Sequence, residues 1–297
     1  MSSTAERQPV AGGIATAVEH RKRPSTLRRF ARNPFAIGAG LFLLVIILAT
    51  AFAPVLARYD PNRIAIGQNL QKPSLSHLLG TDPNGRDEFA RILYGGRISL
   101  LIGVIAMLIS VTFGTLLGAI AGYFRGLTDS LAMRLTDAML AIPVFFLLLA
   151  VLASLGSSVP IIIVAIGLSS WMATARVVRS EVLRTANLDY VVAAQVLGAR
   201  APRIIVHHLL PQALSSMLVA STLGVGQAIL IESALSYLGV GVQPPTASWG
   251  NMLSNAQSYI FAAPLLALWP GMLILLTVLS FNFIGDALRD ALSPYQT

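Results

Sequence analysis

Long apolar segments alternate with short polar ones along most of this chain. A helix needs about 20 mainly apolar residues to cross a bilayer, and six largely uncharged segments approach or exceed that length. They lie at about 35–57, 98–122, 133–155, 159–176, 213–236 and 265–286. The pattern therefore predicts an all-α membrane protein with six transmembrane helices.

Three interruptions set the limits of these spans. The uncharged run from Ala138 to Ala175 could form one long helix, but the turn-forming sequence GSSVP at 156–160 divides it in two. The segment QPPTASWGNMLSNAQ at 243–257 separates the last two spans, because its proline pair and polar residues prevent a helix that crosses lipid. We also expect Pro211 to break the chain before the fifth span.

The composition agrees with a membrane environment. Only 11% of the 297 residues are charged and 55% are hydrophobic, with a mean hydropathy of +0.71, whereas a soluble domain carries about 25% charged residues. The net charge of +8 comes from cations clustered beside apolar runs, which indicates membrane topology rather than a nucleic-acid surface. The chain has no cysteine, so thiolate metal sites, cysteine nucleophiles and disulfides are excluded.

The N-terminal region is polar and basic, and we expect residues 1–33 to form a cytoplasmic tail. A cleaved signal peptide is the alternative, since Ala51, Phe52 and Ala53 resemble a cleavage site. The uncharged run at 33–57 is longer than the 7–15 residues, roughly, of a signal-peptide core. We therefore expect a retained first span.

Lysine and arginine predict the orientation. The tail holds seven of these cations, which places both termini and the segments 123–132 and 177–212 in the cytoplasm. The segment 237–264 falls outside and carries no lysine or arginine. The segment 58–97 also falls outside although it has six, and we expect its acids to pair with them in a folded external element: Asp60, Asp82, Asp87 and Glu88.

The expected domains follow from these assignments. They are a tail (1–33), a first helix with the external segment (34–96), five helices with the loop 177–212 (97–290) and a C-terminal tail (291–297).

One cytoplasmic segment, DYVVAAQVLGARAPRIIVHHLLPQ at 189–212, differs from its apolar surroundings. Good helix formers run from Tyr190 to Leu197, and Gly198 is placed to end that helix as a C-cap with a positive φ. The small side chains of Ala193 and Ala194 allow a partner surface to approach closely. Taken by itself, the pattern also fits an ordinary amphipathic loop between spans.

The same segment resembles the cytoplasmic coupling loop of ATP-binding-cassette (ABC) importer permeases. That loop has the pattern Glu-Ala-Ala, three residues, Gly, nine residues, Ile, one residue, Leu-Pro. The residues at these positions, with the one that follows the glycine, are Val192, Ala193, Ala194, Gly198, Ala199, His208, Leu210 and Pro211. Val192 replaces the usual Glu and His208 the usual Ile, so the resemblance does not imply a salt bridge from the first position.

Three further blocks, at 77–103, 232–253 and 269–292, resemble the second permease subunit of the oligopeptide/dipeptide type. The resemblance implies the type I ABC importer permease fold and half of a translocation path in a bacterial inner membrane. It also implies three kinds of partner besides the lipid bilayer: a homologous permease, two ATP-binding subunits and an external substrate-binding protein. It implies peptides as substrate, with nickel, glutathione or haem as alternatives.

The chain lacks a nucleotide site of its own. It has no G-x-x-x-x-G-K-[ST] sequence, and neither Lys22 nor Lys72 is followed by Ser or Thr. We therefore expect no catalytic residue and no cofactor on this chain, with ATP and Mg²⁺ bound by the partner subunits. Adjacent residues on a helix point about 100° apart, so we expect no metal at His207 and His208.

Some polar and small residues within the spans leave alternatives open. Asp137, Glu232 and Asp286 could relay protons in an ion-coupled secondary transporter, but structural pairing is favoured because all three lie near membrane boundaries. Four glycines on the second span form a stripe that we expect to pack against another subunit: Gly103, Gly114, Gly118 and Gly122.

Overall fold

A computed structural model describes residues 33–292 of the chain. The expected basic tail and most of the expected C-terminal tail lie outside these residues. The described part is helical, and its only β interaction is an isolated bridge between Thr81 and Asp87. Its elements are α2 (Pro34–Ala51), α3 (Ala53–Leu56), α4 (Glu88–Phe124), α5 (Gly126–Ala141), α6 (Val144–Leu155), α7 (Val159–Leu168), α8 (Trp171–Thr185), α9 (Asp189–Val196), α10 (Ala201–Ile204), the π-helix η1 (Ile205–Leu209), α11 (Leu210–Tyr237), α12 (Trp249–Gln257) and α13 (Leu265–Leu292).

Five segments of the described chain are long and apolar enough to cross a membrane. They are Pro34–Ala51, Glu88–Phe124, Val159–Thr185, Ala201–Tyr237 and Leu265–Leu292. The pair α5 and α6 makes a sixth if its two helices count as one span. The expectation of an all-helical protein with multiple spans is therefore confirmed.

The third expected span, 133–155, is wrong as a single helix. Its two halves, α5 and α6, meet at a bend of 82°. Pro143 has no N–H to continue the helix, and it forces Ile142 into an extended conformation with φ −87° and ψ 122°. The sequence correctly predicted an apolar segment, but it did not predict that Ile142 and Pro143 change the direction of the helix axis.

The second span begins ten residues before the expected start. The side chain of Asp87 caps α4 by accepting a hydrogen bond of 2.7 Å from the N–H of Ala90. The first turns of α4 carry Glu88 and Arg91, which are buried and contact the segment 57–87 through Gly80 and Pro61. At 1.5 Å per residue α4 is about 55 Å long, so it extends well beyond the hydrocarbon layer.

We expected Pro211 to break the chain before the fifth span, but it does not. Helical structure continues from α10 through η1 into α11, where Pro211 lies in the first turn. A proline is tolerated there because the first N–H groups of a helix lack intrahelical partners. The wider turn of η1, at 205–209, directly precedes it.

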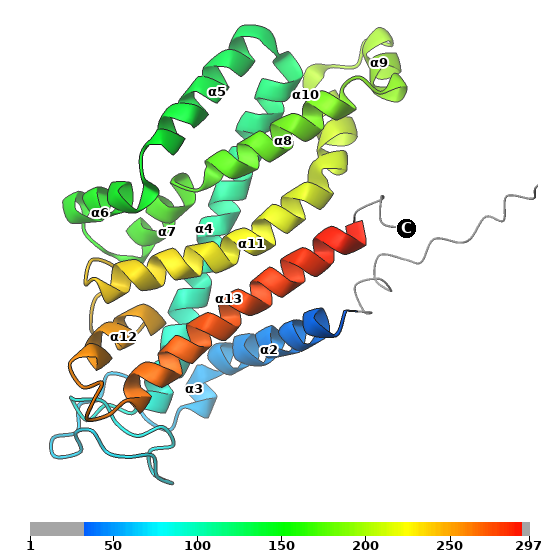
Figure 1. Ribbon diagram of the computed structural model, residues 1–297. Coiled ribbons are helices and arrows are strands. Elements are labelled where there is room, and N and C mark those ends of the chain that lie inside the picture. The colour runs from blue at the N-terminus through cyan, green and yellow to red at the C-terminus, as the bar shows by residue number, and fades with distance from the viewer. Residues whose placement is uncertain (1–32, 293–297) are drawn as a thin grey trace, which may run out of the picture.

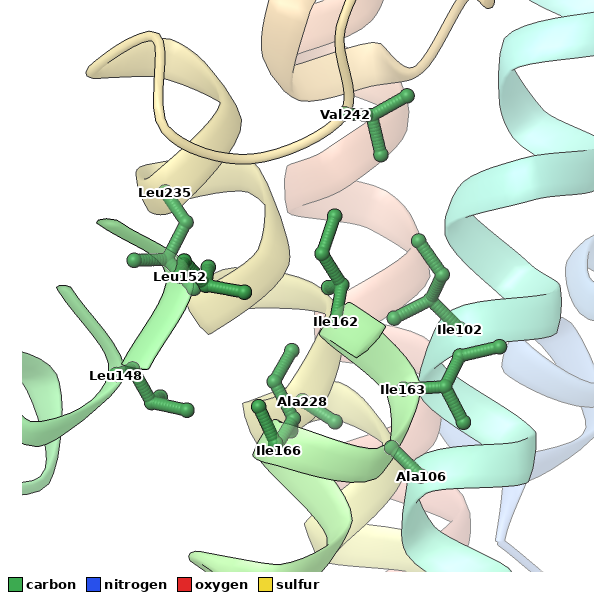
Figure 2. Close-up of a cluster of buried hydrophobic side chains, with 11 residues drawn as sticks. Ile102, Ala106, Leu148, Leu152, Ile162, Ile163, Ile166, Ala228, Leu235 and Val242 are labelled. Atoms are coloured by element: carbon green, nitrogen blue, oxygen red, sulfur yellow. The ribbon is translucent and has the colours of Figure 1, made fainter. Parts of the chain in front are cut away.

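Helix α4 is central to the packing and contacts α7, α8 and α11, while α13 packs against α2, α11 and α12 (Figure 1). One core cluster joins α4, α6, α7, α11 and the loop after α11 (Figure 2). In it, Ile162 and Ile166 of α7 lie between Ile102 of α4 and Leu148 of α6. Apolar packing therefore holds the bent α5–α6 unit to the remaining helices.

The glycine stripe packs within this chain rather than against another subunit, which corrects our expectation. A Cβ atom at Gly118 would lie 2.4 Å from the carbonyl oxygen of Ala175 on α8. One at Gly114 would lie 2.6 Å from the carbonyl oxygen of Trp171. The glycines thus allow α4 and α8 to approach backbone to backbone.

The connecting segments separate into two groups at opposite ends of the bundle. Helices α9 and α10 and the C-terminal end of α13 lie toward the upper right of Figure 1. The segment 57–87 and α12 lie toward the lower left. Segments expected in the cytoplasm therefore share one end, and those expected outside share the other.

Candidate functional site

Helix α9, the centre of the expected coupling loop, buries one side chain in the bundle. Val191 is fully buried and belongs to a cluster with Val178 and Val182 of α8 and Ala119 of α4. Ala199 and Leu210, two other residues of the loop pattern, pack against the same cluster. These two residues and the buried face of α9 therefore hold the loop in place.

Gly198 ends α9 as the sequence predicted. Its φ is +83°, its N–H donates to the carbonyl of Gln195 at 2.9 Å, and the N–H of Ala199 donates to the carbonyl of Ala194 at 3.0 Å. This pair of bonds is the Schellman motif, in which a left-handed residue satisfies the last carbonyls of a helix. No atom lies within 4 Å of a Cβ built at Gly198, so the glycine is required for its backbone conformation.

The opposite face of α9 is apolar and exposed. Val196 is 82% exposed and Leu197 is 87% exposed, and Val192, one turn earlier, is 43% exposed. We call these three residues, with exposed Ala193, the α9 face. Large apolar side chains exposed outside the bilayer, over the end of a helix bundle, are typical of a surface that binds another protein.

Val196 and Leu197 are not among the residues that the coupling-loop pattern singled out. A signal was present, because Val192 and Val196 are four residues apart and therefore share one side of a helix. Ala194, which the pattern emphasises, is only half-exposed. Pro211, by contrast, is exposed in the first turn of α11 and is not part of the α9 face.

The helix that leads into α9 is fixed by ion pairs. Arg179 of α8 donates from Nε and Nη2 to the two carboxylate oxygens of Asp129 on α5. Arg176 donates to Asp137, so this acid is paired as expected. The bidentate contact between Arg179 and Asp129 sets direction as well as distance. A displacement of α9 would therefore be transmitted to α8 and α5 together.

The external segment is folded, and part of its charge is paired as predicted. The carboxylate of Asp82 accepts from Arg86 at 2.6 Å and lies 3.7 Å from Nε of Arg91. His77 contacts Asp87 at 2.8 Å, and its ring stacks on Tyr59 at 4.8 Å between centroids. All five side chains of these three pairs are buried. This end of the bundle is therefore a built structure rather than a loose loop.

Glu232 has a different environment from the boundary position that the sequence suggested. It is fully buried and accepts hydrogen bonds from Ser99 of α4 at 3.0 Å and from Ser236 at 2.7 Å. Ser99 in turn accepts from the N–H of Trp249 at the start of α12. The acid thus joins three helices near the end of the bundle that carries the segment 57–87. Ser236 lies one turn from Glu232 on α11, whereas Ser99 is 133 residues away, so no local pattern indicated the contact with α4.

The described residues contain no group of three His, Cys, Asp or Glu side chains placed to hold a metal ion. His207 contacts the carbonyl of Arg203 in its own helix at 3.3 Å, and the ring of His208 lies 6.1 Å from that of Tyr190. The two histidines therefore serve local contacts in this region.

Comparison with known proteins gives the family. Residues 114–296 match the model described as binding-protein-dependent transport system inner membrane component. Residues 25–73 match the N-terminal transmembrane domain of oligopeptide transport permease C.

Two relatives illustrate the similarity. The glutathione transport system permease protein of Pectobacterium atrosepticum is 42% identical over 268 residues, which cover 90% of this chain and 89% of the relative. The dipeptide transport system permease protein of Alkalihalophilus pseudofirmus is 42% identical over 267 residues, which cover 90% and 88%. The chain belongs to the family of binding-protein-dependent transport system inner membrane components, in its oligopeptide permease branch.

Proposed function

We propose that this chain is one of two homologous permease subunits of an ABC importer, and that it has no ATPase site of its own. Two ATP-binding subunits, which hold ATP and Mg²⁺, dock on the cytoplasmic end, and an external binding protein delivers the substrate. Family membership supports the permease role. The absence of a phosphate-binding loop sequence supports placing ATP hydrolysis on the partners.

The exposed α9 face is the observation that carries this proposal. Burying a fully exposed valine or leucine side chain contributes about 1.5–3 kcal/mol, and both Val196 and Leu197 are more than four-fifths exposed. The Schellman turn at Gly198 fixes the end of α9 and thus the position of these side chains. We infer that the ATP-binding subunits bury this face.

The orientation follows from the same surface. If α9 meets the ATP-binding subunits, its end of the bundle is cytoplasmic, and the folded segment 57–87 faces the external binding protein. The cations expected inside by the positive-inside rule agree, including Arg200 and Arg203 beside α9. Both chain termini are then cytoplasmic, because α2 begins and α13 ends toward that side (Figure 1).

Transport would proceed by alternating access. Closure of the ATP-binding subunits would move α9 together with α8 and α11, because Val191 of α9, Val178 of α8 and Leu210 of α11 pack in one cluster. Helix tilting then opens the path to one side or the other. The bias between the two states must come from contacts that differ between them, and the α9 face supplies such contacts.

We propose a peptide as the substrate, either a dipeptide, an oligopeptide or the tripeptide glutathione. The names of the dipeptide and glutathione permeases that resemble this chain support that class. Glu232 is buried and accepts hydrogen bonds from serines of α4 and α11, which favours a structural role for this acid over a role in ion-coupled transport.

The test combines topology with partner capture. Tags at residues 200 and 297 should report the cytoplasm, and a tag at residue 248 the outside. The chain purified alone should hydrolyse no ATP, and it should co-purify with ATP-binding subunits when these are co-expressed. An external signal at residue 200, or ATPase activity without another subunit, would contradict the proposal.

A further inference from the structure

Two connected cavities run along one side of the bundle, between α8, α11 and α13. The inner cavity, of about 570 Å³, has Glu181, Ser216 and Arg289 in its wall. The deeper one, of about 490 Å³, has Ser170, Gln227 and Asn282. Ala220 and Leu223 border both, so they form a single groove from the inner end to the middle of the bundle.

The groove follows one face of α11. Its lining residues there are Gln212, Ser215, Ser216, Val219, Ala220, Leu223, Gly224, Gln227 and Ala228. They recur every three or four residues, which is the repeat of a single helix face. The groove is therefore a continuous stripe along the helix rather than a set of unrelated gaps.

Gln227 and Asn282 are polar side chains within membrane-spanning helices, where apolar side chains are expected. Each lies ten residues from the end of a 28-residue helix, which is about 15 Å at 1.5 Å per residue, close to mid-depth in a bilayer. Gln227 is exposed. Polar side chains at this depth face a cavity or a partner rather than lipid, and they mark substrate paths.

Neither side-chain amide forms a hydrogen bond within residues 33–292. The hydroxyls of Thr222 and Ser221, by contrast, bond to carbonyls of their own helix. The amides of Gln227 and Asn282 thus keep two donors and one acceptor each for another molecule. A cavity wide enough to hold part of a peptide lies in front of both.

The residues that line the deeper cavity include no charged side chain. Neutral amides match the N–H and C=O groups of a peptide main chain, and they do not depend on the identity of the peptide side chains. Small residues, Ala173, Ala220 and Ala228, leave room for those side chains. This combination suits brief, sequence-tolerant contact.

We propose that Gln227 and Asn282 line this chain's half of the translocation path and hydrogen-bond to the peptide main chain as it passes. The inference rests on the proposed import function. It adds the residues, the depth and the chemistry of the contact.

The absence of cysteine from the chain allows a direct test. Gln227→Cys and Asn282→Cys are each introduced into the complete complex in proteoliposomes and treated with a charged, membrane-impermeant thiol reagent. Labelling is followed on this chain. The control is Leu218→Cys, which is 49% exposed on the opposite face of α11 and closer to its inner end. Both groove cysteines should react, and Leu218→Cys should not.

Turnover tests the contact with peptide. Labelling at the groove positions should slow during ATP-driven uptake of a dipeptide with the binding protein present. Gln227→Leu should lower peptide uptake about fivefold, the effect of one lost hydrogen bond, while Thr222→Val, outside the groove, should not. Co-purification with the second permease should be unchanged in both.

Three results would overturn the inference while ATP-driven uptake by the unmodified complex stays intact. They are absence of labelling at both groove positions, labelling that turnover does not alter, and loss of the second permease from the Gln227→Leu complex. The last would assign Gln227 to contact between the permeases. Failure of the unmodified complex to transport would instead contradict the proposed function.

Discussion

Replacing Gly198 by valine perturbs the end of α9 without removing any contact of the α9 face. A Cβ atom at this position meets no atom within 4 Å in this chain, so the effect is confined to the backbone, whose φ is +83°. A left-handed conformation costs an L-residue about 1–2 kcal/mol. This strain destabilises the backbone conformation that forms the two Schellman hydrogen bonds, which the N–H groups of Gly198 and Ala199 donate. The population with an intact cap should fall about five- to thirtyfold.

Two further variants separate strain from collision with a partner. Gly198→Asn should retain most activity, since asparagine tolerates the left-handed conformation better than valine does. Gly156→Val introduces the same strain at φ +87°, also with no atom within 4 Å of the new Cβ, but in the loop between α6 and α7. That variant should leave binding of the ATP-binding subunits unchanged.

The assay is co-purification of the ATP-binding subunits together with peptide uptake in proteoliposomes, at matched expression. Gly198→Val should insert and fold but lose co-purification and uptake in parallel. Gly198→Asn and Gly156→Val should retain both co-purification and uptake. Equal loss in Gly198→Asn would show that the partner excludes any side chain there. Normal uptake by Gly198→Val would refute the importance of the cap.

Three other substitutions test separate parts of the structure. Leu197→Asp removes an apolar contact of about 1.5–3 kcal/mol and should weaken binding of the ATP-binding subunits at least tenfold. Leu75→Asp, at a leucine 91% exposed on the external segment, should not, and equal effects in a binding assay would argue against the α9 face. Gly118→Val would drive a side chain into the carbonyl of Ala175, at 2.4 Å from the Cβ, and should lower the thermal unfolding temperature through overpacking of about 1–3 kcal/mol. A melting temperature equal to that of the unmodified chain would mean that α4 and α8 are not packed as described. Asp82→Ala leaves buried Arg86 and Arg91 without their carboxylate, which costs about 3–5 kcal/mol. Limited proteolysis should then cut the segment 57–87, and continued resistance would count against the buried pair.

The sequence predicted the spans more reliably than their directions. Apolar length alone located the five long spans, because lipid requires about 20 such residues. It did not predict the 82° bend, which depends on the backbone of Ile142 before Pro143. It also predicted the wrong packing partner for the glycine stripe. The spacing shows that one helix face carries small residues, but it does not show which helix packs against that face.

The structure of the segment 189–212 was predicted in part for a similar reason. The cap at Gly198 follows from local backbone chemistry, which a short sequence contains. The exposure of Val196 and Leu197 depends on which side of α9 Val191 anchors, and that is set by residues of α4 and α8. The hydrogen bond from Ser99 to Glu232 and the groove at Gln227 and Asn282 each join separate helices, so they emerge only when the helices are packed.

Uptake of a labelled dipeptide into proteoliposomes that contain this chain, its partner permease and the ATP-binding subunits tests the central claim most directly. With the binding protein present, uptake should require ATP, stop when the phosphate-binding loop of the partner subunits is mutated, and persist with a protonophore. Uptake driven by an ion gradient through this chain without ATP or ATP-binding subunits would contradict the account.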